Sequence, residues 1–121
     1  LRAAPQSDEH DSLCIYYSSV LESSQWTPHP CNPIKNDIKT GRMAGKLFMH
    51  GENLYRPAQD GARHYGHSMH IQHITKLNTT EYEENTIASI QPEWDKDLLS
   101  THTFSHAGRV TCIDALIKRR K

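Results

Sequence analysis

Five side chains with directed hydrogen-bonding groups lie close together in residues 54–66, whose sequence is Leu-Tyr-Arg-Pro-Ala-Gln-Asp-Gly-Ala-Arg-His-Tyr-Gly. They are Arg56, Gln59, Asp60, Arg63 and Tyr65. Guanidinium, amide, carboxylate and phenol groups can together donate to and accept from the hydroxyls of a polyhydroxylated ligand. Pro57 fixes a backbone angle between them and so stiffens the segment. The segment therefore predicts a binding site for a sugar-like molecule, with Arg42 assisting from a neighbouring segment.

The same residues also permit a structural interpretation. Arginine and aspartate commonly pair inside a domain, and buried polar groups are almost always hydrogen-bonded. Arg56, Gln59 and Asp60 would then form a buried network that holds the fold together. Asp114 has the same two interpretations, because apolar residues flank it: it either supports a turn or lines a pocket.

A metal site is not predicted, although His64, His67, His70 and His73 follow each other at a spacing of three. Successive side chains of a strand point to opposite faces, so this spacing places His64 and His70 on one face and His67 and His73 on the other. Four ligands on two faces cannot surround one zinc ion. The sequence also contains no glycine-rich phosphate loop and no nucleophile elbow, which are the standard sequence signs of a nucleotide site and of a catalytic serine. No cofactor is expected.

The composition limits the possible partners. The chain has 121 residues, which is the size of one domain, but only 36% of them are apolar and the mean hydropathy is −0.74. A core this lean favours additional burial against a second protein chain. Basic and acidic residues number 14 each, so the chain carries no net charge that would favour nucleic acid or an anionic membrane.

The cysteines and the lack of long apolar runs bear on location. Cys14, Cys31 and Cys112 form an odd set without a Cys-x-x-Cys pair, which fits a reducing compartment. No apolar run approaches the roughly 20 residues that cross a bilayer, and no signal-peptide pattern opens the chain, which begins with Leu1 and not with methionine. The expectation is a soluble cytoplasmic protein with no membrane partner.

The pattern along the chain predicts an all-β domain. We expect a mobile arm over residues 1–12, a β domain over 13–117 and a basic tail over 118–121. Alternation of apolar and polar residues and turn signals predict strands at 13–18, 46–50, 54–59, 67–77, 82–91, 101–105 and 109–117, with an edge strand or surface loop at 26–30. Only 19–24 and 95–99 are short helix candidates. Four successive antiparallel strands at 46–91, with two before and two after, are typical of β-propeller blades.

Three segments carry a resemblance to a known family. They are Trp26-Thr-Pro-His-Pro-Cys-Asn-Pro33, Arg42-Met-Ala-Gly-Lys-Leu-Phe48 with residues 54–66, and Thr101-His-Thr-Phe104 with Gly108-Arg-Val-Thr-Cys-Ile-Asp114. In this order, over residues 13–118, they resemble the C-terminal part of a five-bladed β-propeller domain of bacterial carbohydrate-associated proteins. That domain is similar to the N-terminal region of plant glucosamine inositolphosphorylceramide transferases and, distantly, to arabinanase-like glycoside hydrolases.

The resemblance implies sugar binding more than catalysis. In arabinanase-like propellers the two catalytic carboxylates lie on earlier blades, which this chain lacks, and glycoside hydrolysis ordinarily needs such a pair. No catalytic residue is therefore assigned. The family usually has cysteine where this chain has Gly61. The resemblance also implies that His102, on the innermost strand of the last blade, lines an axial channel; a hydrogen-bonded core histidine is the alternative.

Together these expectations describe about two propeller blades per chain, with half-blades at both ends completed by oligomerisation, because open sheet edges invite pairing. A trimer would close six blades and a dimer four, and an isologous dimer or tetramer is the alternative assembly. The leading function is a non-catalytic carbohydrate-binding or assembly module. The alternatives are a glycoside hydrolase or glycosyltransferase with a site between subunits, and a structural oligomer or gene remnant without a ligand.

Overall fold

The fold was analysed in a computed structural model that describes residues 12–119. The predicted arm over residues 1–12 falls almost wholly outside this range, as do the last two residues of the basic tail. Residues 12–119 form thirteen strands and no helix, and every strand pairing is antiparallel. The predicted all-β antiparallel class is therefore confirmed.

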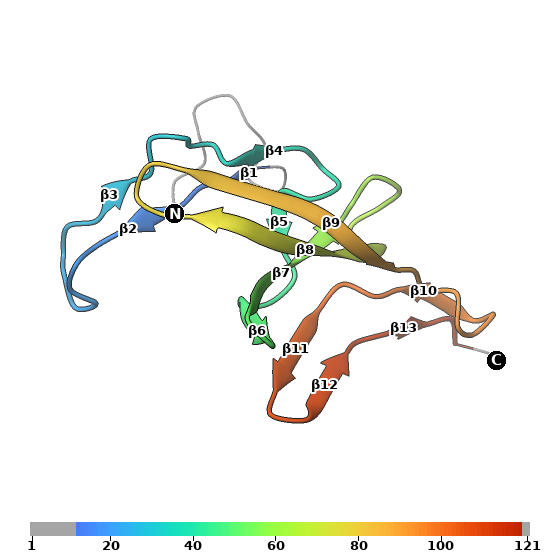
Figure 1. The fold of residues 1–121 in the computed structure, drawn as a ribbon. Coiled ribbons are helices and arrows are strands. Elements are labelled where there is room, and N and C mark those ends of the chain that lie inside the picture. The colour runs from blue at the N-terminus through green and yellow to red at the C-terminus, as the bar shows by residue number, and fades with distance from the viewer. Residues whose placement is uncertain (1–11, 120–121) are drawn as a thin grey trace.

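A large sheet forms the centre of the molecule (Figure 1). Its strands are β5 (Arg42–Met43), β6 (Phe48–His50), β7 (Asn53–Asp60), β8 (Ser68–Leu77) and β9 (Tyr82–Ile90), in the order β5-β7-β8-β9 with β6 also on β7. Strands β5 and β6 pair with opposite ends of β7, so the sheet is four strands wide. The four successive strands predicted at 46–91 are thus confirmed.

An interrupted hairpin precedes this sheet. Strand β1 (Ser12–Leu13) pairs with β4 (Lys35–Asn36), and β2 (Tyr16–Tyr17) pairs with β3 (Thr27–Pro28). Between the two pairs, the Asn32 side chain accepts from the N–H of Ile15 and donates to its carbonyl, which maintains the connection where the ladder breaks. At residues 19–24, which were a short helix candidate, the structure has a turn instead, in which the Ser18 hydroxyl accepts from the N–H of Val20.

A second interrupted hairpin follows the sheet. Strand β10 (Leu98–Ser100) pairs with β13 (Leu116–Ile117), and β11 (Phe104–Ala107) pairs with β12 (Val110–Ile113) across a turn at Gly108. The other short helix candidate, 95–99, is not a helix either. Asp95 instead closes a single turn, because its carboxylate accepts from the N–H of Asp97, and β10 begins at Leu98.

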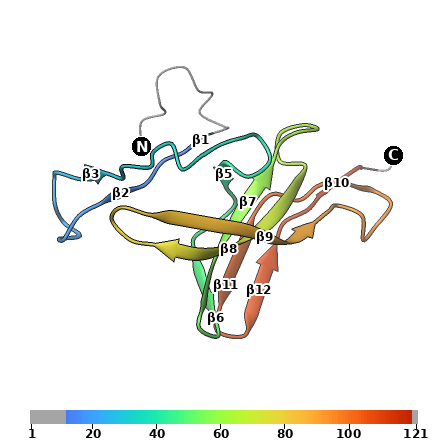
Figure 2. The same ribbon diagram turned by 45° about the horizontal axis from the view of Figure 1, so that its top comes forward.

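The two hairpins cover opposite faces of the central sheet (Figures 1 and 2). Arg56 and Gln72 are register partners, so their side chains share one face of the sheet. The first hairpin lies against this face: Arg56 donates to Glu84, and Lys35 of β4 lies 3.6 Å from the same carboxylate. On the other face, the Phe48 and Phe104 rings stack 5.1 Å apart. The chain therefore forms three layers of two, four and two strands, which agrees with one blade between two half-blades.

Gly45 explains how closely the second hairpin approaches the sheet. The N–H of Phe104 donates to the carbonyl of Ala44, and a Cβ on Gly45 would lie 2.0 Å from the Phe104 carbonyl oxygen. Only glycine permits this contact, because no side-chain atom fits at that distance. Gly45 therefore serves the close packing of two backbone segments.

The core is small and follows β7 and β8. The apolar residues buried in it are Leu13, Ala44, Ala58, Met69, Ile71 and Ile74. Because a hairpin lies on each face, β8 is buried on both sides, and its polar residues Ser68 and Gln72 are each only 1% exposed. This lean core agrees with the low apolar content, and it makes polar networks an unusually large part of the interior.

Candidate functional site

The structure places the eight predicted site residues in three separate groups and one loop. Four of them, Arg42, Tyr65, His102 and Asp114, come together on the face that the second hairpin covers. We call these four residues the Tyr65 cluster. Gln59 adjoins it, Arg56 and Asp60 belong to two other networks, and Arg63 is exposed in the loop between β7 and β8.

The Tyr65 cluster is assembled by three parts of the fold. Arg42 lies on β5, Tyr65 in the β7–β8 loop, and His102 between β10 and β11. The Arg42 guanidinium carbon lies 4.7 Å from the centre of the Tyr65 ring, and Nη2 of Arg42 donates to the Tyr65 hydroxyl at 3.3 Å. The His102 ring meets the same tyrosine ring edge-on at 5.8 Å. Tyr65 remains 63% exposed, although Arg42 and His102 both contact its ring.

Asp114 holds the imidazole of this cluster in place. One carboxylate oxygen accepts from the backbone N–H groups of His102 and Thr103, both at 2.8 Å, and the other contacts Nδ1 of His102. Burial opposes ionisation of Asp114, but these hydrogen bonds and the nearby imidazole outweigh it and hold the pKa of the carboxyl group below its ordinary value. The pairing fixes the ring and leaves Nε2 as the nitrogen that can face a ligand.

Gly66 allows the His102 ring to lie where it does. Gly66 has a φ of +70°, which favours glycine, and a Cβ there would lie 3.1 Å from the His102 ring. Thr101 is fully buried and its N–H donates to the carbonyl of His67. The close approach of Gly66 and the hydrogen bond from Thr101 to His67 together position the His102 ring against the β7–β8 loop.

Gln59 supplies an unsatisfied polar atom beside the cluster. It is the register partner of Arg42 across β5 and β7, so the two side chains share one face of the sheet. Its amide nitrogen donates to the carbonyl of Met43, whereas its Oε1 is buried and has no hydrogen-bond partner within residues 12–119. Such an atom normally bonds to a water molecule or a ligand, because an unpaired buried acceptor is costly.

Arg56 lies in a buried network, as the structural interpretation allowed. Its guanidinium donates to both carboxylate oxygens of Glu84, at 2.9 and 2.7 Å, and to the carbonyl of Thr40 at 2.6 Å. Gln72 and Tyr82 also donate to the Glu84 carboxylate. We call Arg56, Gln72, Tyr82 and Glu84 the Arg56 network. The Arg56 and Glu84 side chains are only 2% and 1% exposed, so neither can reach a ligand at the surface.

The charges of the Arg56 network stabilise each other. Burial opposes the charged form of Glu84, but hydrogen bonds from Arg56 and Tyr82 outweigh it and lower the pKa of the carboxyl group. Burial and the same carboxylate raise the pKa of the Tyr82 hydroxyl, which therefore stays protonated and can donate. Lys35 of the first hairpin lies 3.6 Å from Glu84 and connects that hairpin to the network.

Asp60 belongs to a third group, a row of side chains across three strands. Its Oδ2 lies 2.8 Å from Nε2 of His70, and Nδ1 of His70 lies 2.7 Å from the hydroxyl of Ser89. We call Asp60, His70 and Ser89 the His70 row. The other carboxylate oxygen of Asp60 accepts from the N–H of Ala62. The sequence identified Asp60, but neither its histidine partner nor the serine.

Sequence reasoning also missed Glu84. The available signal was Arg56 itself, which interrupts an otherwise apolar stretch of β7 and so requires a carboxylate partner in the interior. Tyr82 and Glu84 alternate on β9 with more exposed neighbours, which marks them as facing inward. At Gly61, where the family resemblance leads one to expect cysteine, a Cβ would meet only Ile38 at an ordinary 3.6 Å, so the structure has room for a side chain.

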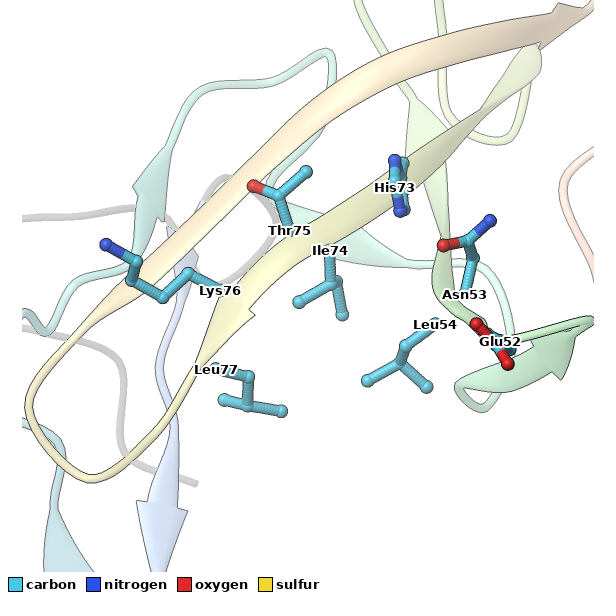
Figure 3. Close-up of a pocket in the computed structure, with 8 residues that line it drawn as sticks. All are labelled: Glu52, Asn53, Leu54, His73, Ile74, Thr75, Lys76 and Leu77. Atoms are coloured by element: carbon cyan, nitrogen blue, oxygen red, sulfur yellow. The ribbon is translucent and has the colours of Figure 1, made fainter.

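Two hollows lie away from the Tyr65 cluster. One, of about 230 Å³, lies between the first hairpin and the central sheet and is lined mainly by apolar residues, with Arg56 among them. The other, of about 420 Å³, lies beside the start of β7 and the end of β8 (Figure 3). There the Lys76 side chain extends away from Glu52 and Asn53, and Glu81 holds its amine at 3.0 Å. Neither hollow is lined by a residue of the Tyr65 cluster.

Within residues 12–119, no group of three or more histidine, cysteine or carboxylate side chains is placed to hold a metal ion. His64 and His67 lie ring to ring at 4.9 Å, while His70 and His73 contact different partners. The same part of the chain contains no helix of the length and apolarity needed to cross a membrane.

The chain matches the family described as "Glucosamine inositolphosphorylceramide transferase 1, N-terminal" over residues 3–105. It therefore belongs to this family, as the sequence resemblance predicted. The matched region includes Arg42, Tyr65 and His102, whereas Asp114 lies beyond its end.

Two curated relatives support the assignment. The chain is 35% identical over 79 residues to glucosamine inositolphosphorylceramide transferase 1 of Oryza sativa subsp. japonica, and 39% identical over 79 residues to the protein of the same name from Oryza sativa subsp. indica. Each match covers 64% of this chain and 10% of the relative, so the chain spans about a tenth of the length of these proteins. No solved structure matches the chain.

Proposed function

We propose that the Tyr65 cluster binds a carbohydrate without transforming it. The observation that supports this most is that Arg42 and His102, from separate parts of the fold, both contact the exposed Tyr65 ring, and that Asp114 holds His102 in place. An aromatic ring stacks on the apolar face of a sugar, while the neighbouring guanidinium and imidazole groups donate to its hydroxyls.

The family supports a polyhydroxylated ligand. The curated relatives are named for a transferase of glucosamine inositolphosphorylceramide, and both glucosamine and inositol carry several hydroxyl groups. The proposal concerns only the binding of such a group by this chain. The activity of the much longer relatives is not assigned to it.

The electrostatics of the cluster favour binding over hydrolysis. A catalytic acid for glycoside cleavage needs a carboxyl group whose pKa is raised toward neutrality. The pKa of Asp114 is instead lowered, since burial is outweighed by hydrogen bonds from the N–H groups of His102 and Thr103. Its carboxylate is already occupied by three donors, so it orients the His102 ring more readily than it exchanges a proton.

The experiment is a ligand titration with matched variants. Inositol, glucosamine and short oligosaccharides are titrated by calorimetry and NMR against the wild type, Tyr65→Ala and His102→Ala. Loss of the aromatic contact should weaken binding roughly two- to tenfold. The control is Trp26→Ala, which removes another exposed aromatic side chain from the first hairpin. Absence of binding to every ligand, or equal binding by Tyr65→Ala and the wild type, would contradict the proposal.

We also infer that the two half-blades are completed by another copy of the chain. Each hairpin has two strands where the central sheet has four, and large apolar side chains of the second hairpin remain exposed: Leu99, Val110, Ile113, Leu116 and Ile117. Pairing of one copy's second hairpin with the first hairpin of the next would bury this surface and close a ring of four or six blades. Light scattering tests it: a dimer or trimer supports the inference, and a monomer opposes it.

The alternative function, an enzyme whose site forms between subunits, has its own test. Turnover of activated aryl glycosides or nucleotide sugars would depend on the oligomer and would disappear on dilution. Absence of turnover in the assembled protein would leave carbohydrate binding as the better explanation. Turnover that persists in the dissociated chain would contradict both the shared site and non-catalytic binding.

A further inference from the structure

We propose that Ser89 is a nucleophile for acyl transfer, with His70 as its base and Asp60 as the residue that positions the base. The substrates are small acyl esters. This proposal rests on the His70 row, which shares no residue with the Tyr65 cluster, and it is independent of carbohydrate binding.

The three groups connect in the order that a serine nucleophile requires. The Ser89 hydroxyl lies 2.7 Å from Nδ1 of His70, and Nε2 of the same ring lies 2.8 Å from the Asp60 carboxylate. Because a carboxylate only accepts, Nε2 must carry the ring proton of the neutral imidazole, so Nδ1 has the free electron pair. The Ser89 hydroxyl therefore donates to a nitrogen that can take its proton, which is the role of the base in serine hydrolases.

The fold holds the base in place and leaves the hydroxyl accessible. The His70 and Asp60 side chains are only 14% and 15% exposed, whereas Ser89 is an exposed residue. The second oxygen of Asp60 is fixed by the N–H of Ala62, so the carboxylate cannot rotate freely. Residues 70 and 89 are direct register partners on β8 and β9, which fixes the spacing between the base and the hydroxyl.

In this proposal the developing negative charge would be stabilised by backbone N–H groups at the edge of the central sheet. Strand β9 is the last strand of the central sheet as described, with β8 as its single neighbour there. Backbone N–H groups along the outer edge of such a strand have no partner within the sheet. Donors of this kind next to a nucleophile can stabilise the oxyanion of an acyl-transfer intermediate.

A second histidine–hydroxyl pair in the protein provides an internal comparison. Nδ1 of His106 lies 2.8 Å from the Thr111 hydroxyl, across β11 and β12. The ring of His106 lies 5.4 Å from the ring of Phe48, in a tilted arrangement, and meets the His50 ring edge-on. Within residues 12–119, no carboxylate pairs with His106. Of these two pairs, the His70 row is the one that combines a hydroxyl and an imidazole with a carboxylate that orients the ring.

The proposed reaction takes place between Ser89, His70, the ester and one water molecule, while Asp60 positions the imidazole. Ser89 Oγ attacks the ester carbonyl carbon as its proton moves to Nδ1 of His70, which forms a tetrahedral oxyanion. The bond from this carbon to the leaving oxygen then breaks, and the His70 proton passes to the alcohol that departs. The product is an acyl-serine, and water hydrolyses it by the same proton transfers in the reverse direction, which restores the hydroxyl.

The experiment uses two probes on the full chain. Diisopropyl fluorophosphate forms a bond to the nucleophilic oxygen and releases fluoride, and peptide mass spectrometry locates the adduct. p-Nitrophenyl acetate releases one nitrophenol for each acyl group transferred, which gives the rate. The variants are Ser89→Ala, His70→Gln and Asp60→Asn, and Thr111 in the wild type is the internal control. Circular dichroism and thermal unfolding verify that each variant is folded.

The expected result is an adduct on Ser89 and none on Thr111. The acylation rate should fall roughly 100-fold or more in His70→Gln, because general-base catalysis contributes factors of this size. In Asp60→Asn the adduct should still form at Ser89, but more slowly. A wild type with no adduct on Ser89, or a labelling rate that is unchanged in a folded His70→Gln variant, would overturn the proposal. The wild-type result decides the matter even if a variant fails to fold.

Discussion

Removal of the Glu84 carboxylate tests the claim that a buried ion pair supports this lean core. In Glu84→Ala the Arg56 guanidinium, which is 2% exposed, loses its bidentate partner and keeps only the carbonyl of Thr40 and the sulfur of Met43. An uncompensated buried charge of this kind costs about 3–5 kcal/mol of the free energy of unfolding. Since whole domains are stable by about 5–15 kcal/mol, the loss should be close to limiting.

The assay is thermal and urea unfolding followed by circular dichroism. At about 4 °C for each kcal/mol in a domain of this size, the midpoint of thermal unfolding should fall by roughly 12–20 °C. Glu81→Ala is the matched control, because Glu81 lies just before β9 and bonds Lys76 at 3.0 Å, but both side chains are exposed. This control should leave the midpoint unchanged within error, since exposed pairs contribute little.

A double variant separates the buried charge from lost packing. Arg56→Met combined with Glu84→Leu removes both charges and keeps apolar volume, so it should be at least about 1 kcal/mol more stable than Glu84→Ala. If Glu84→Ala unfolds at the temperature of the Glu81→Ala control, the Arg56 network does not support the fold and the reasoning is refuted. If the double variant is the least stable of the three, packing and not charge explains the loss.

Two further predictions concern the second hairpin. Gly45→Ala places a Cβ 2.0 Å from the Phe104 carbonyl oxygen and should cost roughly 1–3 kcal/mol in urea unfolding, whereas Gly61→Ala should be nearly neutral; equal effects would contradict the close approach. The protein should also lose stability in acid, because the pKa of Asp114 lies below its ordinary 3.8: hydrogen bonds from the His102 and Thr103 N–H groups outweigh burial. The stabilisation is complete above the pKa of the unfolded chain and is lost as the pH falls through the folded pKa, so Asp114→Asn should flatten the acid limb of a stability–pH curve.

The strands could be predicted because their patterns are local. Alternation over residues 54–59, 67–77 and 82–91 and the turn signals between them fixed β7, β8 and β9 to within a few residues. The two short helix predictions failed for a physical reason. Serine and aspartate at 18–23 and 95–97 bond their own backbone in turns, and this competes with helix formation in segments too short to gain from packing.

The candidate site could be predicted only in part. Residue types selected Arg42, Tyr65 and Asp114, and the family resemblance added His102, but no local pattern indicates that these four meet. Their meeting depends on the second hairpin lying against the central sheet, which Gly45 permits.

Partner choice was also beyond the sequence. Arg56 and Asp60 lie four positions apart on one strand, yet one pairs with Glu84 on β9 and the other with His70 on β8. Cross-strand register and the irregularities in the pairing of β8 with β9 decide which side chains meet, and these depend on the folded sheet.

The most direct measurement of the central claim is an NMR titration of the isotope-labelled chain with inositol, glucosamine and short oligosaccharides. If the Tyr65 cluster binds carbohydrate, at least one ligand should shift the backbone signals around Arg42, Tyr65, His102 and Asp114. Tyr65→Ala should reduce these shifts, and Trp26→Ala should not. Shifts confined to the β8–β9 turn, or none with any ligand, would contradict this claim.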